Sequence, residues 1–147
     1  MDRFDERILQ ELKADGRLSN VELATRIGLS PSATLRRVQE LEQNNTIIGY
    51  RALLNPIKQG IEFVAYVEIG LSDHSKAAQQ DFELCIQRAK EVVECHNITG
   101  TKEYLLRVET SSLSTYKHFH AEVLGAIKQI NSISTSVVMD SPKDVRA

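Results

Sequence analysis

The first 45 residues repeat a pattern of apolar positions at helical spacing, in three short runs. The apolar members of these runs are Phe4, Ile8, Leu9 and Leu12, then Leu23, Ala24 and Ile27, then Leu35, Val38 and Leu41. A residue type that caps helix N-termini precedes each run, at Asp2, Ser19 and Ser30. The pattern predicts three helices, the first over Arg3 to about Ala14 and the third ending near Asn44.

The junction between the second and third runs has the residues of a tight turn. Gly28 stops the second run, and Pro31 follows the cap residue Ser30 at the first helical position, where its missing N–H costs nothing. Ala24, four residues before the glycine, is small enough to let two helices approach closely. Together these features predict a helix-turn-helix.

The third run has an outer face that is small and free of acidic residues. If Leu35, Val38 and Leu41 point inward, the residues expected to contact DNA are Ser30, Ser32, Ala33, Thr34, Arg36, Arg37 and Gln39. Arginine binds guanine edges or backbone phosphate, and the N–H groups of a helix N-terminus favour phosphate. The alternative is an ordinary three-helix bundle with solvated arginines.

The register of this face departs from the simplest repressor-type helix-turn-helix, in which Thr34 and Arg37 would be buried. The apolar stripe falls one residue later, at Leu35 and Val38. We therefore expect a slightly longer turn, as in winged-helix variants, and we expect Arg37 to face outward toward DNA.

Residues 46–54 are rich in β-forming side chains, and Asn55-Pro56 then interrupts the pattern. This segment predicts a strand or wing that leads into a hinge ending near Gly60. Arg51 is a candidate either for contact with backbone phosphate or for a plain exposed strand position.

From Phe63 to Leu71 every second residue is apolar, which is the pattern of a half-buried strand. Two helical stripes and three further strands follow, so the order of elements is βαββαβ, a ferredoxin-like split βαβ. Both helices are expected on one face of the sheet. The other face, which includes Tyr66 and Val138, needs a cover, most economically a second copy of the chain.

The predicted fold class is α+β, a winged helix-turn-helix domain followed by a ferredoxin-like βαββαβ sandwich. The predicted boundaries are a DNA-binding domain at 1–45, a wing strand and hinge linker at 46–60, a regulatory and oligomerisation domain at 61–141 and a tail at 142–147.

Composition limits the choice of class. The 147 residues are 41% hydrophobic and 26% charged, with a formal net charge of -2, which is typical of a soluble globular protein. The longest apolar run, residues 63–67, is far too short to cross a bilayer, and the first residues contain no signal core. Cys85 and Cys95 are too few for a disulfide framework and are expected to be small buried hydrophobes. We expect a cytoplasmic protein with no membrane partner.

No catalytic, metal or cofactor site is predicted. His118 and His120 are two residues apart on a predicted helix and point to different sides, so they do not form a metal-binding pair. Gly100 stands alone, without the further glycines of a phosphate-binding loop.

Short stretches of the sequence, taken in order, resemble the Lrp/AsnC (feast/famine) family of bacterial and archaeal transcription regulators. The matching stretches are residues 5–9, 15–23, 27–32, 37–38, 41–42, 49–50, 52–56, 94–96, 100, 104–106 and 137–139. Each is short, but the ordered set covers nearly the whole chain. The resemblance implies a DNA-binding lobe, a strand-containing hinge and a βαββαβ regulatory lobe, in homodimers that often assemble into tetramers or octamers.

The resemblance also implies a small effector, usually an amino acid, which sits between dimers near a Gly-x-x-Asp-Tyr turn. Here Glu103 replaces the usual aspartate. Backbone groups at the start of the turn suit a carboxylate, and the Glu103 carboxylate suits an α-ammonium group. A tight hairpin with solvated charges is the alternative. The implied effector residues are Gly100, Thr101, Glu103, Tyr104 and Ser136.

We therefore expect a sequence-specific transcription regulator that binds double-stranded DNA, works at the nucleoid and responds to an amino acid. The alternative is a nucleoid-associated architectural protein with little sequence preference. A metabolic enzyme, or the regulatory domain of one, is a third hypothesis, which the lack of a catalytic set opposes.

Overall fold

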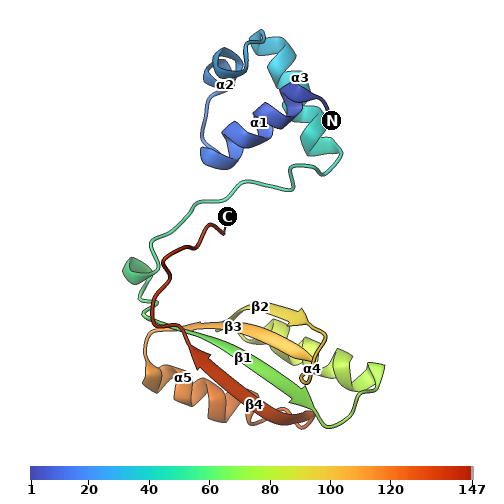
Figure 1. The fold of residues 1–147 in the computed structure, drawn as a ribbon, viewed down its shortest axis with the longest axis vertical. Coiled ribbons are helices and arrows are strands. Elements are labelled where there is room, and N and C mark those ends of the chain that lie inside the picture. The colour runs from blue at the N-terminus through green and yellow to red at the C-terminus, as the bar shows by residue number, and fades with distance from the viewer. Residues whose placement is uncertain (147) are drawn as a thin grey trace. The chain divides into compact units, whose positions relative to one another are not determined.

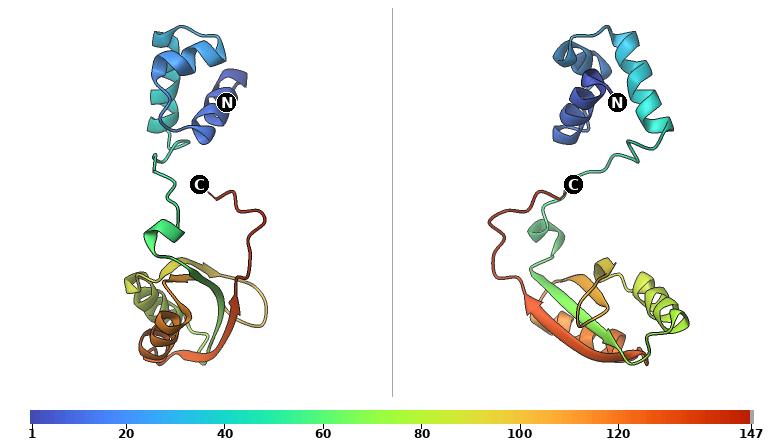
Figure 2. Two further views of the ribbon diagram at one scale, coloured as in Figure 1. Left: turned by 90° about the vertical axis from the view of Figure 1, so that its left-hand side faces the viewer. Right: turned by 45° about the vertical axis from the view of Figure 1, so that its right-hand side comes forward.

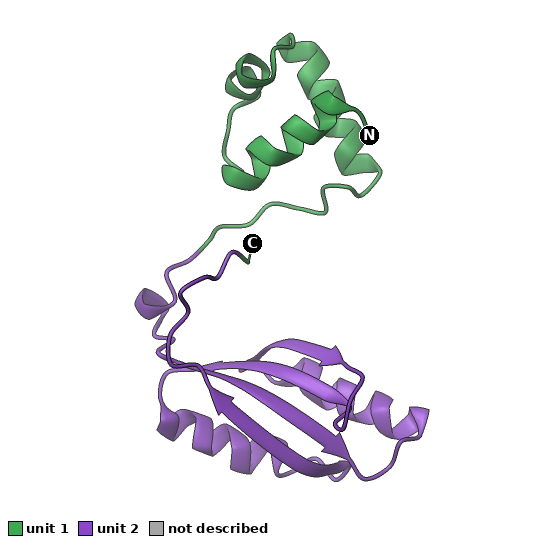
Figure 3. Cartoon of the chain, viewed as in Figure 1, with its two compact units in different colours: residues 1–53, 146–147 green, residues 54–145 purple. Residues whose placement is uncertain are grey.

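The structure is a computed structural model that describes residues 1–146. These residues form two compact units, Met1–Leu53 and Leu54–Val145, which we call the N-terminal unit and the C-terminal unit (Figures 1 and 3). The boundary between them lies within the segment that the sequence predicts as a hinge.

The N-terminal unit contains the three predicted helices, α1 (Arg3–Ala14), α2 (Asn20–Ile27) and α3 (Pro31–Gln43). Each predicted cap accepts a hydrogen bond from a backbone N–H three residues on, at distances of 3.0 Å for Asp2, 3.1 Å for Ser19 and 3.2 Å for Ser30. The core of the unit is built on Ile8, Leu23, Ile27 and Leu41. The three helices and their caps are thus confirmed.

The predicted roles of Gly28, Ser30 and Pro31 in the turn between α2 and α3 are confirmed, but the expected longer turn is not needed, because the buried residues of α3 follow the simplest repressor-type register. Gly28 ends α2 with a φ of 81°, in the left-handed region that glycine adopts most readily. Ala24 is buried, which lets the helices approach closely, and the side-chain amide of Asn20 donates to the carbonyl oxygen of Pro31 at 2.8 Å. The first turn of α3 is therefore tied to the start of α2.

The strand predicted for residues 46–54 is absent. Residues 44–62, all of them described, contain no strand; a turn at residues 44–47 is followed by irregular chain and then by a short 3-10 turn, Ile57–Gln59. A strand needs a partner for its backbone hydrogen bonds, and the described chain places no partner strand beside this segment. Tyr50 holds the segment to its own unit, because its hydroxyl donates to Glu42 at 2.8 Å.

The C-terminal unit has the predicted βαββαβ order. Its strands are β1 (Phe63–Leu71), β2 (Val92–Asn97), β3 (Tyr104–Thr110) and β4 (Ile130–Val137), and its helices are α4 (Lys76–Arg88) and α5 (Leu113–Phe119), the latter continued by a π-helical turn, His120–Leu124. In the described residues the strands form one antiparallel sheet in the order β2-β3-β1-β4. Both helices pack on one face of it (Figures 1 and 2).

Alternation along β1 decides which residues enter the core. Ala65, Val67 and Ile69 are fully buried on the side covered by the helices, where they meet Phe82 of α4. Cys85 and Cys95 are exposed, so the expectation that both are buried is wrong. Cys85 lies beside the Phe82 stripe of α4 rather than on it, and Cys95 is on an edge strand.

The uncovered face of the sheet carries a polar cluster around Arg107. Its guanidinium donates to Glu109 at 3.0 Å and to the Tyr66 hydroxyl at 2.8 Å, and Glu94 lies 3.8 Å away. The Arg107 side chain is only 8% exposed, because these neighbours enclose it. The open face therefore carries a cluster that is ordered by charge and hydrogen bonds.

Candidate functional site

The outer edge of α3 is the candidate DNA-reading surface. Ser30, Ser32, Arg36 and Gln39 are exposed there, and Ala33 is half-buried. Arg36 has no ion-pair or hydrogen-bond partner within residues 1–146. A free guanidinium beside small side chains can reach a base edge or a phosphate without first breaking an internal contact.

The register predicted for α3 is wrong at Thr34 and Leu35. Thr34 is 0% exposed, whereas Leu35 is 46% exposed on the outside of the helix. The Thr34 hydroxyl donates to the carbonyl oxygen of Ser30 at 2.9 Å, so its only polar side-chain group is satisfied within its own helix. Threonine can therefore fill the core position, and the buried stripe matches the simplest repressor-type pattern.

Arg37 also lies on the inner side of α3, contrary to the expectation that it faces DNA. Its Nη1 donates to Asp2 at 2.7 Å and to Asp5 at 3.1 Å. The guanidinium also stacks 5.2 Å from the centroid of the Phe4 ring, and the side chain is 22% exposed. Arg37 therefore fastens α3 to the start of α1, and of these two adjacent arginines only Arg36 is exposed.

This contact makes the stability of the N-terminal unit depend on pH. The Asp5 N–H, and after it the Arg37 guanidinium, lower the pKa of the Asp2 carboxyl below its ordinary value of 3.8. Because the Asp2 pKa is lower in the folded chain than in the unfolded chain, the ionised carboxylate stabilises the unit at a pH above its ordinary pKa. This stabilisation is lost as the pH falls through the lowered, folded-state pKa.

We expect Arg37→Gln to lower the melting temperature of the N-terminal unit by a few degrees at pH 7, because both carboxylates lose their cation. The loss of stability below about pH 4 should also become less steep, since less of the Asp2 pKa shift remains. Thermal melts followed by circular dichroism from pH 3 to pH 7 measure both effects. Arg36→Gln, in the exposed neighbour, should leave the melts unchanged; equal effects of the two variants would contradict the assignment.

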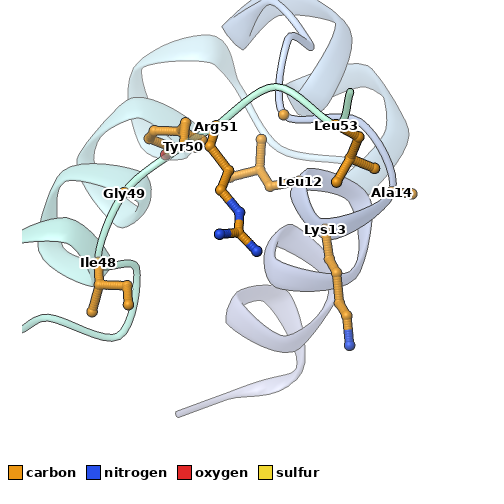
Figure 4. A pocket seen from close by; sticks show the side chains of 9 residues that line it. Leu12, Lys13, Ala14, Ile48, Gly49, Tyr50, Arg51 and Leu53 are labelled. Carbon is orange, nitrogen blue, oxygen red and sulfur yellow. The ribbon is translucent and has the colours of Figure 1, made fainter. Parts of the chain in front are cut away.

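An open hollow of about 590 Å³ lies between α1 and the segment that follows α3 (Figure 4). Leu12, Ile48, Tyr50 and Leu53 supply much of its lining. The basic side chains at this hollow, Lys13 and Arg51, extend in the same direction in Figure 4. Exposure of large apolar side chains on this segment, including Ile48 at 93% and Leu53 at 77%, is characteristic of a surface that meets a partner.

The candidate effector turn joins β2 to β3. Gly100 has a φ of 127°, which an L side chain would strain, so the glycine is needed for the turn. Thr101 is exposed beside it. The Ile98 N–H closes the turn by donating to the carbonyl oxygen of Glu103 at 2.8 Å, and the Glu103 N–H ties the turn to β1 by donating to the carbonyl oxygen of Ile69 at 3.1 Å.

The Glu103 carboxylate already has partners in the chain. One oxygen accepts the backbone N–H of Leu71 at 2.8 Å, and the other lies 2.8 Å from Nδ1 of His74. These contacts, the Leu71 N–H foremost, lower the pKa of the Glu103 carboxyl. Gly70 has no side chain, which leaves room for these groups: a Cβ at this position would come within 2.4 Å of Ser132 Oγ and 3.8 Å of a Glu103 oxygen. The carboxylate is thus ionised and fixed at the end of the sheet.

The other two predicted effector residues, Tyr104 and Ser136, do not lie beside the Glu103 carboxylate within one chain. Tyr104 pairs with Ile69, so its side chain points to the helix-covered side, where it is 1% exposed and bonds to Glu83. Tyr104 is therefore a core residue beneath the turn, and its side chain is not exposed for the predicted contact with a ligand. Ser136 pairs with Tyr66, three residues or about 10 Å along β1 from Ile69.

The residues that the sequence analysis missed come from distant positions. His74 lies 29 residues before Glu103, and Leu71 contributes only its backbone. No spacing pattern marks either. Within residues 1–146, no group of three or more potential metal ligands comes together, and no helix is long and apolar enough to cross a membrane.

Comparison with known proteins assigns both units. Residues 1–48 match the winged helix-turn-helix DNA-binding family, and residues 64–147 match the Lrp/AsnC ligand binding domain. The chain belongs to the Lrp/AsnC family. This Lrp/AsnC protein is a DNA-binding transcription regulator, and the family is not one of enzymes. The predictions of family, fold class and general function are confirmed.

Three similar proteins place the chain within the Lrp/AsnC family. It is 39% identical over 144 residues to a proline dehydrogenase transcriptional activator of Rhizobium radiobacter, covering 98% of this chain and 92% of that one. It is 40% identical over 143 residues to the leucine-responsive regulatory protein of Escherichia coli strain K12, covering 97% and 87%. A transcriptional regulator from Neisseria meningitidis, crystallised as an L-Met complex, has a TM-score of 0.94 and 33% identity, covering 98% and 93%.

Proposed function

We propose that two copies of α3 enter successive major grooves of a pseudo-palindromic DNA site, with half-sites about one helical turn, ~34 Å, apart. The DNA contacts would come from the exposed edge, formed by Ser30, Ser32, Ala33, Arg36 and Gln39. The observation that carries this proposal is the free guanidinium of Arg36 on that edge, next to an Arg37 that is engaged internally. Thr34 and Arg37 would support the helix from behind.

Footprinting across the genome tests this proposal. We expect discrete protected sites with two-fold symmetry, because α3 offers directional side chains for base contact. Broad coverage without symmetric sites would instead favour an architectural protein that binds DNA with little sequence preference. The near-neutral overall charge, formally -2, supports the specific role, since non-specific binders rely on excess positive charge.

We also propose that the effector is an amino acid bound at the turn that contains Glu103. Backbone groups of Gly100 and Thr101 would hold its carboxylate, and Glu103 would pair with its α-ammonium group. The ligand would have to compete with His74 for the Glu103 carboxylate. The L-Met complex of the Neisseria regulator and the name of the leucine-responsive relative support an amino-acid ligand.

Glu103→Gln should weaken binding of the amino-acid effector roughly tenfold to a hundredfold, because a charge-assisted hydrogen bond is worth about 1.5–3 kcal/mol. Calorimetric titration of the wild type with each of the common amino acids first identifies the ligand, and the variant is then titrated with it. Glu122→Gln, at an exposed glutamate outside the turn, is the matched control. A wild type that binds none of the amino acids would contradict the proposed effector class.

We infer that the working form is a homodimer that assembles further into tetramers or octamers. The exposed apolar segment around Ile48 and Leu53 and the ordered open face around Arg107 support such contacts. An effector shifts such an equilibrium only through different affinities for the assembled states. Sedimentation with and without the amino acid identified by calorimetry would reveal the shift.

A further inference from the structure

The outer side of α3 has an apolar side chain where a DNA-reading edge is otherwise polar. Within the described residues of α3, Leu35 is the only large hydrophobic side chain classed as exposed, at 46%. Its outward neighbours on the helix are Ser32, three residues before it, and Gln39, four residues after it. Arg36 follows it directly and is also exposed, about 100° further round the helix.

This exposure is not a consequence of loose packing. Thr34 fills the core position beside it with full burial and a satisfied hydroxyl, and Leu41 is also buried on that side of α3. The helix is therefore fixed in a register that buries the threonine and turns the more hydrophobic leucine outward. A single exposed leucine is ordinary on a protein surface, but here its position on the reading edge gives it a definable contact.

The major-groove edge of DNA presents one apolar group that a leucine can recognise, the 5-methyl of thymine. The neighbouring side chains Ser32 and Ala33 are small enough to let the helix approach the base edges. Neither of the outward neighbours Ser32 and Gln39 is charged, so burying Leu35 against a methyl group does not remove a charge on either neighbour from water.

We propose that Leu35 contacts a thymine methyl in each half-site and thereby sets the base preference at that position. This inference rests on the proposed entry of α3 into the major groove. Arg36 would contact the adjacent guanine edge or phosphate, so Leu35 supplies an apolar element of specificity beside a charged one. Removing one methyl group from water corresponds to roughly a fourfold change in affinity, or about fifteenfold for two half-sites.

The test replaces each thymine in a footprinted site, one symmetric pair at a time, by deoxyuridine, which removes only the methyl group. Wild-type protein should lose about fifteenfold in affinity at one thymine pair, measured by fluorescence anisotropy. Leu35→Ala should bind the unmodified site more weakly and should show no further loss at that pair. Leu35→Met, which keeps an apolar side chain of similar size, should retain most of the loss.

Leu84→Ala is the matched control, since Leu84 is a half-exposed leucine on α4 of the C-terminal unit and should leave the deoxyuridine effect intact. Discrete binding with no methyl effect at any thymine, or an undiminished effect in Leu35→Ala, would overturn this inference alone. Absence of discrete sites would overturn the proposed DNA-reading function and this inference with it.

Discussion

Replacing Arg36 with alanine is expected to weaken binding to a specific DNA site by at least about thirtyfold. The Arg36 side chain is exposed and has no partner in the described chain, so it is free to make a bidentate contact to guanine or an ion pair with phosphate. A bidentate arginine–guanine contact discriminates by about 1–3 kcal/mol, and a dimer carries two copies of the contact. Titration of labelled DNA at fixed salt measures the loss.

The salt dependence then separates the two kinds of contact. If Arg36 meets phosphate, the slope of log affinity against log salt should fall by about 0.9 for each phosphate ion pair that the substitution removes. If it meets a guanine, discrimination at one base pair should disappear instead. Arg37→Ala is the comparison, because Arg37 is paired with Asp2 and Asp5: it should destabilise the N-terminal unit but leave affinity within about threefold at low temperature. A decrease equal to that of Arg36→Ala would place Arg37 on DNA.

The contrast between these two arginines marks the limit of what the sequence predicts. Helix starts at Ser19 and Ser30 were predictable because a cap bonds to a backbone N–H only three residues away. The orientation of Arg37 was not, because its partners are 32 and 35 residues distant in the chain. The apolar stripe also misled at Leu35, since a threonine with a self-satisfied hydroxyl packs as an apolar residue does.

The effector turn shows the same division. Gly100 and the hairpin around it follow from local turn chemistry, and the alternation of β1 correctly placed its core residues. The engagement of Glu103 depends on His74 and on the Leu71 N–H, which only the folded sheet brings close. Residues 46–54 have strand composition but no neighbouring strand in the described chain, and composition alone does not form a strand.

The largest expected effect on stability is that of Phe82→Ala. The Phe82 side chain is 0% exposed, in the centre of the core between α4 and the sheet, and its ring centroid lies 4.5 Å from that of Tyr104. Removing a buried phenylalanine costs about 3–5 kcal/mol, a large share of the roughly 5–15 kcal/mol that stabilises a typical domain. The turn that leads into Tyr104 should lose its support, so effector binding should fall with the melting temperature.

Leu84→Ala is the control, because Leu84 is two residues further along α4 and 50% exposed, so its truncation should cost well under about 1 kcal/mol. The two units have separate hydrophobic cores, so calorimetry should show that Phe82→Ala lowers the transition of the C-terminal unit and leaves that of the N-terminal unit in place. A shift of both transitions together would mean that the units unfold as one. If the two variants were equally destabilised, this would contradict the proposal that the buried Phe82, and not the exposed Leu84, supports the effector turn.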